Sequence, residues 1–478
     1  MEQAKQLFGR QLESSQLLEH YHSNASAMVA IVGRRRIGKT FLVRRVLEGL
    51  IDFEMTGTQH SNKKEQLNSF IYSLSNFSKS AMLTQPPKSW QEAFHLLKLY
   101  LTEKKGKKKK IVFIDELPWI ATPKSGFTEA LAHFWNDWAS ENNVLLIVCG
   151  SAAAWMVNNV VNSKGGLHNR ISQTIYLEPF TLNETWQLVK GMKIKGTHHQ
   201  VIELYMALGG VPYYLSLLKK ELSIPQNIDR LLFEKNGKLA SEYENLFSSL
   251  FDNSTNHYNI IDILATKWKG LTRLEIAGLY PGKDGGALTQ ILDELRLSGF
   301  IAKYNSYQKA TKDALYRLSD PYLLFYKKFL AKPPVKKSFL NAMKTANYKI
   351  WCGYAFENLC LYHIPQIKQK LGIAKIESSE SSFFYRGNRE ANGFQIDLMI
   401  DRADGIINLC EIKFYNAAFT IDKAYYHEMK NRMDNFSNIS KIRKAVHLTL
   451  ITSLGINEND YSAELVDSEV IGEDLFVV

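Results

Sequence analysis

The sequence predicts an α/β protein of several domains, with a parallel sheet near the N-terminus and a separate α/β domain at the C-terminus. Strand-like apolar runs alternate with helical stretches over residues 27–151, which is typical of a parallel sheet. A Pro-Pro linker interrupts the chain after Ala331, and further strand-like runs follow it. The chain of 478 residues is too long for one ordinary core, and its length suggests about three domains.

The composition is that of an ordinary globular protein, with 45% hydrophobic and 22% charged residues. The formal charge of +11 is compatible with a polyanionic partner. Four cysteines without a C-x-x-C pair argue against a disulfide framework or a zinc site and fit a reducing compartment. The N-terminus has no apolar signal core, and we interpret the uncharged window 142–163 as a core strand with polar breaks. We therefore expect a cytoplasmic protein without a membrane span.

The first strand-like run and the turn after it carry the clearest motif. Residues 28–32 are apolar, a turn follows, and a helical pattern covers residues 41–49. In this context the G-x-x-x-x-G-K-[ST] motif binds polyphosphates, because backbone N–H groups surround the phosphates at a helix N-terminus. The alternative is a strand–turn–helix unit with a chance match. The predicted ATP-binding residues are Gly33, Arg34, Arg35, Arg36, Ile37, Gly38, Lys39 and Thr40.

A second apolar run supplies two carboxylates for the same site. Residues 111–114 are followed by Asp115 and Glu116. Within the phosphate loop we expect Lys39 to reach the β- and γ-phosphates and the Thr40 hydroxyl to ligate Mg²⁺. Asp115 would then hold the Mg²⁺ shell, and Glu116 would orient and polarise the attacking water. The alternative is a strand that ends in a solvated acidic turn.

The next strand-like run, residues 144–149, ends at Gly150 and Ser151, which places a hydroxyl where a γ-phosphate sensor could stand. With this element the chain resembles the AAA+/STAND branch of P-loop ATPases, and in particular the archaeal-type ATPases of prokaryotes. The resemblance covers about residues 5–220 and implies an ASCE-type parallel sheet, with an extra strand between the two Walker motifs and a catalytic glutamate. Its motif residues are Phe8-Gly9-Arg10, the loop 33–40, Phe113-Ile114-Asp115-Glu116, Gly150-Ser151, Leu167-His168-Asn169-Arg170, Leu177-Glu178-Pro179-Phe180 and Gly209-Gly210-Val211-Pro212.

The resemblance implies roles for three further positions. Ser151 corresponds to the first sensor, and Pro212 to the proline of a G-x-P element that packs on adenine. Arg170 corresponds to an arginine that senses the γ-phosphate within the chain or across a subunit contact. The second arrangement would require a homo-oligomer. Each position also has a plain alternative: a capping serine, a helix-start proline and a surface arginine.

The middle of the chain has the pattern of a winged helix-turn-helix. One helical face contains Ile260 and Leu264, Thr272 is the expected cap of a second helix over residues 273–279, and a third helix covers residues 287–298. Residues 299–303 and 314–318 then indicate a two-stranded wing. The third helix carries Asp293 and Glu294 against Arg296, which disfavours contact with DNA phosphates and favours a packing or lid module. The wing cations Lys303, Lys309, Lys312 and Arg317 keep DNA binding open.

Charged residues stand inside apolar strands in the C-terminal part. Residues 406–414 read as a central strand in which Glu411 and Lys413, two positions apart, project from one face. Asp397 lies in the preceding strand-like run, 394–401. Ionised groups in a central strand are costly unless they are paired or bind a metal.

This order, with Glu357 on a preceding helix, resembles the PD-(D/E)xK restriction-endonuclease-like fold, and it matches the C-terminal domain of some archaeal-type ATPases. The resemblance covers about residues 340–478, with Ile396 in place of the motif's proline. It implies that Asp397 and Glu411 ligate Mg²⁺, that Lys413 orients water or stabilises phosphorane charge, and that Glu357 serves a second metal or the outer shell. The alternative is a buried Glu–Lys pair in an inactive domain.

These observations predict an ATPase whose nucleotide state controls a Mg²⁺-dependent nuclease-like domain that acts on DNA in preference to RNA. A STAND-like signalling switch with an inactive nuclease-derived tail, and a middle module that recognises a protein or DNA, is the alternative function. The predicted domains are the ATPase core (1–185), a helical lid (186–252), the winged-helix-like module (253–330), a linker (331–340) and the nuclease-like domain (341–478).

Overall fold

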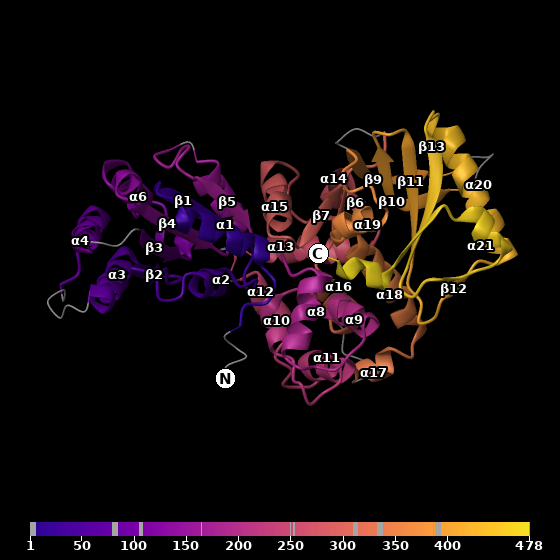
Figure 1. Ribbon diagram of the computed structural model, residues 1–478, viewed down its shortest axis with the longest axis horizontal. Coiled ribbons are helices and arrows are strands. Elements are labelled where there is room, and N and C mark those ends of the chain that lie inside the picture. The colour runs from indigo at the N-terminus through magenta and orange to yellow at the C-terminus, as the bar shows by residue number, and fades with distance from the viewer. Residues whose placement is uncertain are drawn as a thin grey trace. The chain divides into compact units, whose positions relative to one another are not determined.

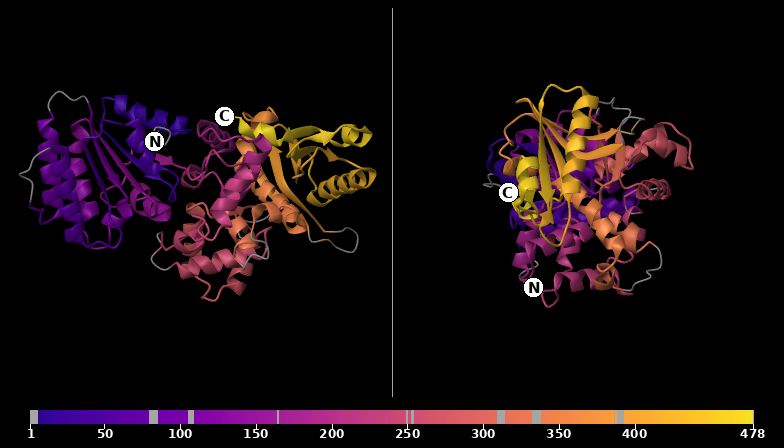
Figure 2. Two further views of the ribbon diagram at one scale, coloured as in Figure 1. Left: turned by 90° about the horizontal axis from the view of Figure 1, so that it is seen from below. Right: turned by 90° about the vertical axis from the view of Figure 1, so that its right-hand side faces the viewer.

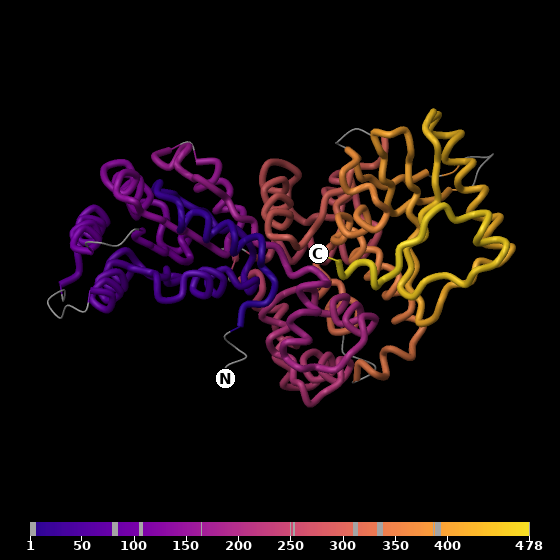
Figure 3. Tube along the Cα trace, in the orientation of Figure 1, coloured from indigo at the N-terminus to yellow at the C-terminus, as the bar shows by residue number. Residues whose placement is uncertain are grey.

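The computed structural model of this chain describes residues 6–78, 85–104, 109–163, 165–248, 250–251, 254–308, 314–331, 338–385, 387 and 393–477. It forms two compact units, Met1–Pro179 and Phe180–Val478. The course of the chain through both units can be followed in Figures 1 and 3. Lys309 and Lys312 of the predicted wing and residues 332–337 of the predicted linker lie outside the described residues.

The N-terminal unit is built on a five-stranded parallel sheet in the order β2-β3-β4-β1-β5. Strand β4 lies between β1 and β3, so the predicted extra strand between the two Walker motifs is confirmed. The strands are β1 (Ala27–Val32), β2 (Phe53–Thr56), β3 (Lys110–Asp115), β4 (Val144–Gly150) and β5 (Gln173–Tyr176). The helices are α1 (Gln11–His22), α2 (Lys39–Val46), α3 (Lys63–Ser78), α4 (Trp90–Glu103), α5 (Leu117–Ile120), α6 (Phe127–Asp137) and α7 (Ala153–Met156), with short η2 (Ala139–Glu141) and η3 (Val157–Val161).

Helices cover both faces of this sheet (Figure 2). Alternate residues of β1 enter two different cores, as the two-residue period of a strand requires. Met28 and Ala30 pack with α3, α4 and α6, whereas Val29 and Ile31 pack with α1 and α2. A strand buried on both faces is a near-continuous apolar run, which is the pattern that the sequence shows at residues 28–32.

The C-terminal unit begins with five helices, of which α9 is central. All eight residues from Val201 to Leu208 are buried, and α9 contacts α8, α11, α16 and α18. The buried Glu203 on α9 accepts a hydrogen bond from the Tyr348 hydroxyl of α18 at 3.1 Å. The helices are α8 (Leu182–Gly191), α9 (His198–Leu208), α10 (Pro212–Ser216), α11 (Ile224–Leu232) and α12 (Glu242–Leu246).

A smaller helical module with a three-stranded antiparallel sheet follows. The predicted cap of its second helix is confirmed, because Thr272 and Glu275 form a reciprocal capping box. The prediction of a two-stranded wing was incomplete, because β6 also pairs with β8 to give the order β6-β8-β7. The elements are α13 (Thr255–Ala265), β6 (Leu271–Thr272), α14 (Arg273–Leu279), α15 (Gly286–Leu297), β7 (Ile301–Tyr304), β8 (Leu315–Leu318) and α16 (Pro321–Phe329).

The last part of the chain contains a mixed five-stranded sheet in the order β15-β13-β11-β10-β9. Strand β11 is central, as predicted, and is antiparallel to β10 and parallel to β13. The elements are α17 (Phe339–Ala342), α18 (Ala346–Tyr362), α19 (Ile364–Lys370), β9 (Ser378–Tyr385), β10 (Phe394–Arg402), β11 (Ile406–Lys413), β12 (Phe419–Thr420), α20 (Lys423–Ser440), β13 (Ala445–Thr452), β14 (Ile456–Asn457), α21 (Asp460–Leu465), β15 (Ser468–Ile471) and η5 (Gly472–Phe476).

His363 ties the start of this unit to α18. Its Nε2 accepts from the Leu182 amide at 2.9 Å, so its Nδ1 carries the proton and donates to the Leu359 carbonyl at 2.8 Å. The ring is 1% exposed, and this burial lowers its pKa from 6.5 to about 4. The folded unit therefore holds the neutral imidazole.

We expect the C-terminal unit to lose stability as pH falls from about 6.5 toward about 4. The unfolded chain binds a proton on His363 in this window and the folded chain does not, so acid favours unfolding by up to about 3 kcal/mol. Thermal unfolding at pH 7.5 and 5 should show a smaller pH-induced loss for His363→Leu than for the wild type. His427→Leu, at an exposed site, is the control, and an unchanged pH dependence in His363→Leu would contradict the prediction.

Candidate functional site

The predicted phosphate loop joins β1 to α2. A Cβ on Gly33 would lie 2.4 Å from Ile37 Cδ1 and 2.5 Å from the Leu177 carbonyl oxygen, so only glycine fits there. Gly38 has φ of +89°, the left-handed region that other residues rarely adopt. The two motif glycines are thus required for different reasons, Gly33 for lack of space and Gly38 for its backbone conformation. The turn that they permit leads directly into the N-terminus of α2.

The loop is supported from outside by Arg10, the last residue of the Phe8-Gly9-Arg10 motif. Its side chain is 4% exposed. Its guanidinium donates to the Glu178 carbonyl at 2.6 Å and to the Ile37 carbonyl at 3.4 Å. Arg10 therefore links the phosphate loop to the segment that follows β5. This link explains, in structural terms, why an arginine stands at this position of the motif.

Lys39 and Thr40 open α2 and face the end of β3. The buried Lys39 ammonium donates to the carbonyls of Gly33 and Arg34 at 2.9 and 3.0 Å. The Thr40 hydroxyl donates to Asp115 Oδ2 at 2.6 Å. The predicted lysine, hydroxyl and carboxylate are therefore brought together at the carboxyl edge of the sheet.

Glu116 is held in an unusual backbone conformation beside them. Its φ of 51° is left-handed, which for a residue other than glycine is uncommon and concentrates at functional sites. Glu116 Oε2 accepts from the Ser151 amide at 2.9 Å and from the Ser151 hydroxyl at 2.8 Å. The predicted sensor serine is thus in direct contact with the predicted catalytic glutamate.

We expect Ser151→Ala to reduce the rate of ATP hydrolysis about tenfold with little change in ATP affinity. A hydrogen bond to a charged group contributes about 1.5–3 kcal/mol, and the variant keeps only the one from the backbone amide. Steady-state kinetics and nucleotide binding would measure the two effects separately. Ser151→Thr retains the hydroxyl and serves as the control. A normal turnover number in Ser151→Ala would show that this hydroxyl does not position Glu116.

Cys149 was missed by the sequence reasoning. Its Sγ lies 2.7 Å from Asp115 Oδ1, and burial, followed by the charge of Asp115, raises the pKa of the thiol well above its usual value. The thiol is therefore a donor to the Walker-B carboxylate. The sequence feature that could have indicated this contact is the position of Cys149, one residue before the end of a strand that neighbours β3.

Three further residues predicted to bind the nucleotide lie in different segments of the chain. Arg36 lies in the loop with φ of 73°. Arg170 is exposed in the segment before β5. Pro212 occupies the first turn of α10 in the C-terminal unit. The structure therefore leaves the roles of Arg170 and Pro212 as predictions.

Comparison with known proteins agrees with this geometry. Residues 7–218 match the family described as an ATPase domain predominantly from Archaea. This part of the chain is therefore similar to archaeal-type P-loop ATPase domains. The assignment implies nucleotide binding, and it covers the same region as the motifs from Phe8-Gly9-Arg10 to Pro212.

Two relatives extend the comparison. An uncharacterized protein of Methanocaldococcus jannaschii is 22% identical over 400 residues, which cover 82% of this chain and 83% of the relative. The structure of a Walker-type ATPase of Pyrococcus abyssi superposes with a TM-score of 0.51 at 18% identity, over 68% of this chain and 96% of the other. At that identity the second similarity shows the fold alone.

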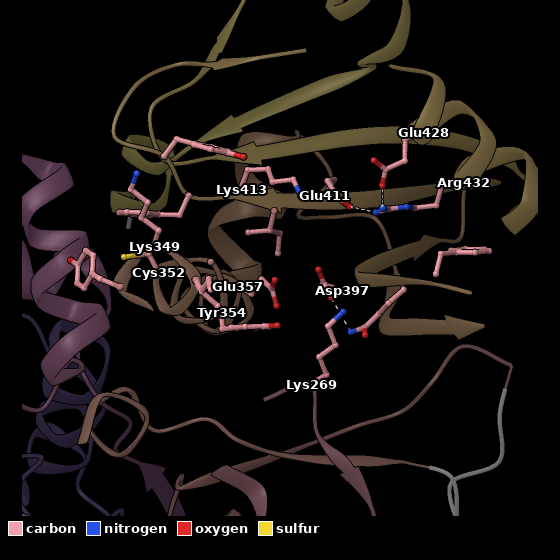
Figure 4. A pocket seen from close by; sticks show the side chains of 18 of the residues that line it. Lys269, Lys349, Cys352, Tyr354, Glu357, Asp397, Glu411, Lys413, Glu428 and Arg432 are labelled. Atoms are coloured by element: carbon pink, nitrogen blue, oxygen red, sulfur yellow. Dashed lines mark hydrogen bonds and ion pairs between the residues drawn. The ribbon is translucent and has the colours of Figure 1, made fainter. Parts of the chain in front are cut away.

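The C-terminal unit contains a second group of predicted site residues. Glu357, Asp397, Glu411 and Lys413 line one pocket of about 1200 Å³ (Figure 4). Glu357 comes from α18, Asp397 from β10, and the other two from β11. The register of β10 against β9 shifts between Ile396 and Met399, next to Asp397. Such a bulge redirects a side chain and is common beside active sites.

The carboxylates of this pocket repel one another. Burial, followed by the charge of Asp397, raises the pKa of Glu357 to about 8. Burial, followed by the charge of Glu411, also raises the pKa of Asp397. Lys269 and Arg317, from the preceding module, oppose both shifts. A group of like charges in a half-buried pocket attracts cations.

Glu411 has cationic partners on both oxygens. Lys413 lies 2.8 Å from Oε1, and Arg432 of α20, which the sequence reasoning missed, lies 2.8 Å from Oε2. Burial disfavours the charge of Lys413, but the negative charge of Glu411 and its hydrogen bond with Lys413, together with the charge of Tyr415, outweigh burial and raise the lysine pKa. Lys413 is therefore charged at neutral pH and can act as a hydrogen-bond donor.

Within the described ranges, no group of three or more His, Cys, Asp or Glu side chains is arranged to hold a metal ion. No helix in the described part of the chain has both the length and the apolar character needed to cross a bilayer.

Proposed function

We propose that this protein couples ATP hydrolysis to a Mg²⁺-dependent nuclease site that cleaves DNA. The observation that carries the proposal is that the four charged residues predicted from the C-terminal motif converge on one pocket. Titratable groups with shifted pKa values that converge on one pocket mark a candidate functional site. The ATPase domain would supply the regulating nucleotide cycle.

The nucleotide site fits Mg²⁺ with ATP. Thr40 Oγ1 and Asp115 Oδ2, 2.6 Å apart, are oxygen donors of the kind that Mg²⁺ uses together with phosphates. Lys39 would exchange its two loop carbonyls for phosphate oxygens, and Glu116 would orient the attacking water. Arg170 would sense the γ-phosphate in a homo-oligomer or within the chain, and Pro212 would pack on adenine.

The C-terminal pocket fits Mg²⁺ in a more limited way. Asp397 and Glu411 offer only oxygen donors, and their mutual repulsion would be relieved by a cation. They do not form a complete protein cage, but Mg²⁺ is usually held by one or two carboxylates, with water and substrate phosphate completing the shell. Bound there, the ion would activate a water and stabilise charge on the phosphate.

The chain's own groups would then act on a phosphodiester. The water oxygen forms a bond to phosphorus and loses a proton, while the bond from phosphorus to the departing sugar oxygen breaks and that oxygen gains a proton. The charged Lys413 would donate to the developing negative oxygen, and Arg432 would hold Glu411 in place. Glu357 would take part in the outer shell.

We propose the domain limits predicted from the sequence, with residues 253–330 as a winged-helix module and 341–478 as a restriction-endonuclease-like domain. The one cation of the third helix, α15, is Arg296, and it is engaged by Asp293 at 3.4 Å, while Glu294 of the same helix pairs with His257 at 2.7 Å. This helix therefore offers little for DNA phosphates. We place the DNA contact at the C-terminal pocket.

A STAND-like signalling switch with an inactive tail is the second candidate. Its supporting observation is that Lys413 and Arg432 together neutralise Glu411 without any metal. It predicts slowly exchanging nucleotide and a biological effect that persists in Glu411→Ala.

The deciding experiment incubates the full chain with linear, supercoiled and single-stranded DNA in Mg²⁺ or Mn²⁺, with and without ATP. We expect cleavage by the wild type and none by Asp397→Ala. No cleavage of any form by the wild type would remove the nuclease proposal and favour the signalling switch.

A further inference from the structure

The turn between α13 and β6 is fixed against the C-terminal pocket. The Trp268 ring stacks on Tyr354 of α18, with centroids 6.0 Å apart and planes 23° from parallel. The Lys328 ammonium lies over the Trp268 ring, 6.0 Å from the ring centroid. Because Trp268 is fixed in this way, the next residue, Lys269, is held at the rim of the pocket.

Two further contacts fasten the same module to the C-terminal sheet and helix. Arg317 of β8 donates to the Asn358 side chain at 3.0 Å, next to Glu357. The Tyr307 amide donates to the Ser382 carbonyl of β9 at 2.7 Å. The module thus contacts α18 and β9 at three separate places, so the position of Lys269 is set by more than its own turn.

Lys269 differs in its pairing from two other cations of the pocket, Lys413 and Arg432. Lys413 and Arg432 are both committed to Glu411. In the part of the chain that the structure describes, Lys269 makes no hydrogen bond or ion pair, although its ammonium points into the pocket toward Asp397 (Figure 4). An unpaired ammonium beside carboxylates, in a pocket open to solvent, is suited to an anion that lies across those carboxylates.

We propose that Lys269 binds the phosphodiester backbone of the nucleic-acid strand that lies across Asp397 and Glu411. The inference rests on the proposed nuclease function and adds a substrate-binding residue from outside the nuclease-like domain. The winged-helix-like module then contributes to substrate binding through its first turn, and not through the third helix that such modules ordinarily use. It forms one wall of the substrate site.

Lys267 provides a matched control. It lies in the same turn and carries the same charge, but it pairs with Glu275 at 3.0 Å and is not part of the pocket. Lys267→Ala and Lys269→Ala therefore change the net charge equally. Lys269→Arg keeps the charge and tests for rescue.

The experiment measures binding of the full-length protein to fluorescent DNA and RNA oligonucleotides by anisotropy. Ca²⁺ replaces Mg²⁺ to limit cleavage. For Lys269→Ala we expect about fivefold weaker binding and a salt slope shallower by about 1, as for loss of one phosphate contact. Lys267→Ala should bind like the wild type, and Lys269→Arg should recover most of the loss. The DNA and RNA arms show which strand the site accepts.

Three results would overturn the inference. If the wild type binds and Lys269→Ala behaves like Lys267→Ala, Lys269 makes no backbone contact, while the proposed function stands. If Lys269→Ala weakens binding with an unchanged salt slope, its effect is structural. If the wild type binds neither DNA nor RNA, the proposed function fails and the inference fails with it.

Discussion

The Glu116→Gln variant is expected to bind ATP and to hydrolyse it about 100-fold more slowly than the wild type, or slower still. A positioned group that moves a proton in the transition state contributes about 10²–10⁴-fold. Glutamine can still accept the two hydrogen bonds that Ser151 donates to Oε2, but it lacks the negative charge that polarises the attacking water. Lys39, Thr40 and Asp115 are unchanged, so nucleotide binding should persist.

Phosphate release and retained nucleotide would be measured together on the full chain. Glu48→Gln is the control, because Glu48 is exposed and its carboxylate pairs with Arg45 at 2.8 Å. Lys39→Ala should fail at the earlier step and retain little nucleotide. Hydrolysis by Glu116→Gln within a few fold of the wild type would mean that Glu116 does not act on the water, despite its left-handed backbone.

The Lys413→Ala variant is expected to cleave DNA about 10²–10³-fold more slowly than the wild type, the usual loss when one donor to developing charge is removed. The ammonium of Lys413 is charged and is held 2.8 Å from Glu411. Arg432 continues to pair with Glu411 in the variant, so the fold and the position of Glu411 should be maintained. Mn²⁺ binding by the variant should therefore change much less than its cleavage rate.

Lys430→Ala is the matched control for this measurement. Lys430 lies on α20, the helix that carries Arg432. Its ammonium is paired with a carboxylate as that of Lys413 is, but the partner is Glu464 of α21 and not Glu411. Its loss should leave cleavage unchanged. Equal cleavage by Lys413→Ala and the wild type would assign Lys413 to the Glu411 ion pair alone, and would favour the signalling switch.

Local motifs predicted more of this molecule than long-range contacts did. The phosphate loop, the Walker-B carboxylates and the central position of β11 follow from spacing and from strand or helix periods within short windows. The sequence placed Ser151 near the phosphates but did not predict its contact with Glu116, because that contact depends on which strands are neighbours. The extra strand between the two Walker motifs was inferred by resemblance and is confirmed.

Residues that reach a site from a different element could not be found in the same way. Cys149 is an ordinary apolar position in its strand, and its contact with Asp115 requires β4 to lie beside β3. Arg432 lies in a helix with several charged residues, and nothing in the sequence around it distinguishes it from an ordinary charged residue on a helix surface. Lys269 belongs to a turn that is distant in sequence from every carboxylate it faces. The third strand of the small sheet was missed because two residues give no periodicity.

The central claim is that the nucleotide state of the ATPase domain controls cleavage at the C-terminal pocket. The most direct measurement is the DNA cleavage rate of the wild type and of Lys39→Ala, each with and without saturating ATP, with Asp397→Ala as the blank. We expect ATP to change the wild-type cleavage rate by about fivefold or more, which is the range of ordinary coupling between sites. The cleavage rate of Lys39→Ala should be the same with and without ATP. Equal cleavage rates in all four conditions would contradict it.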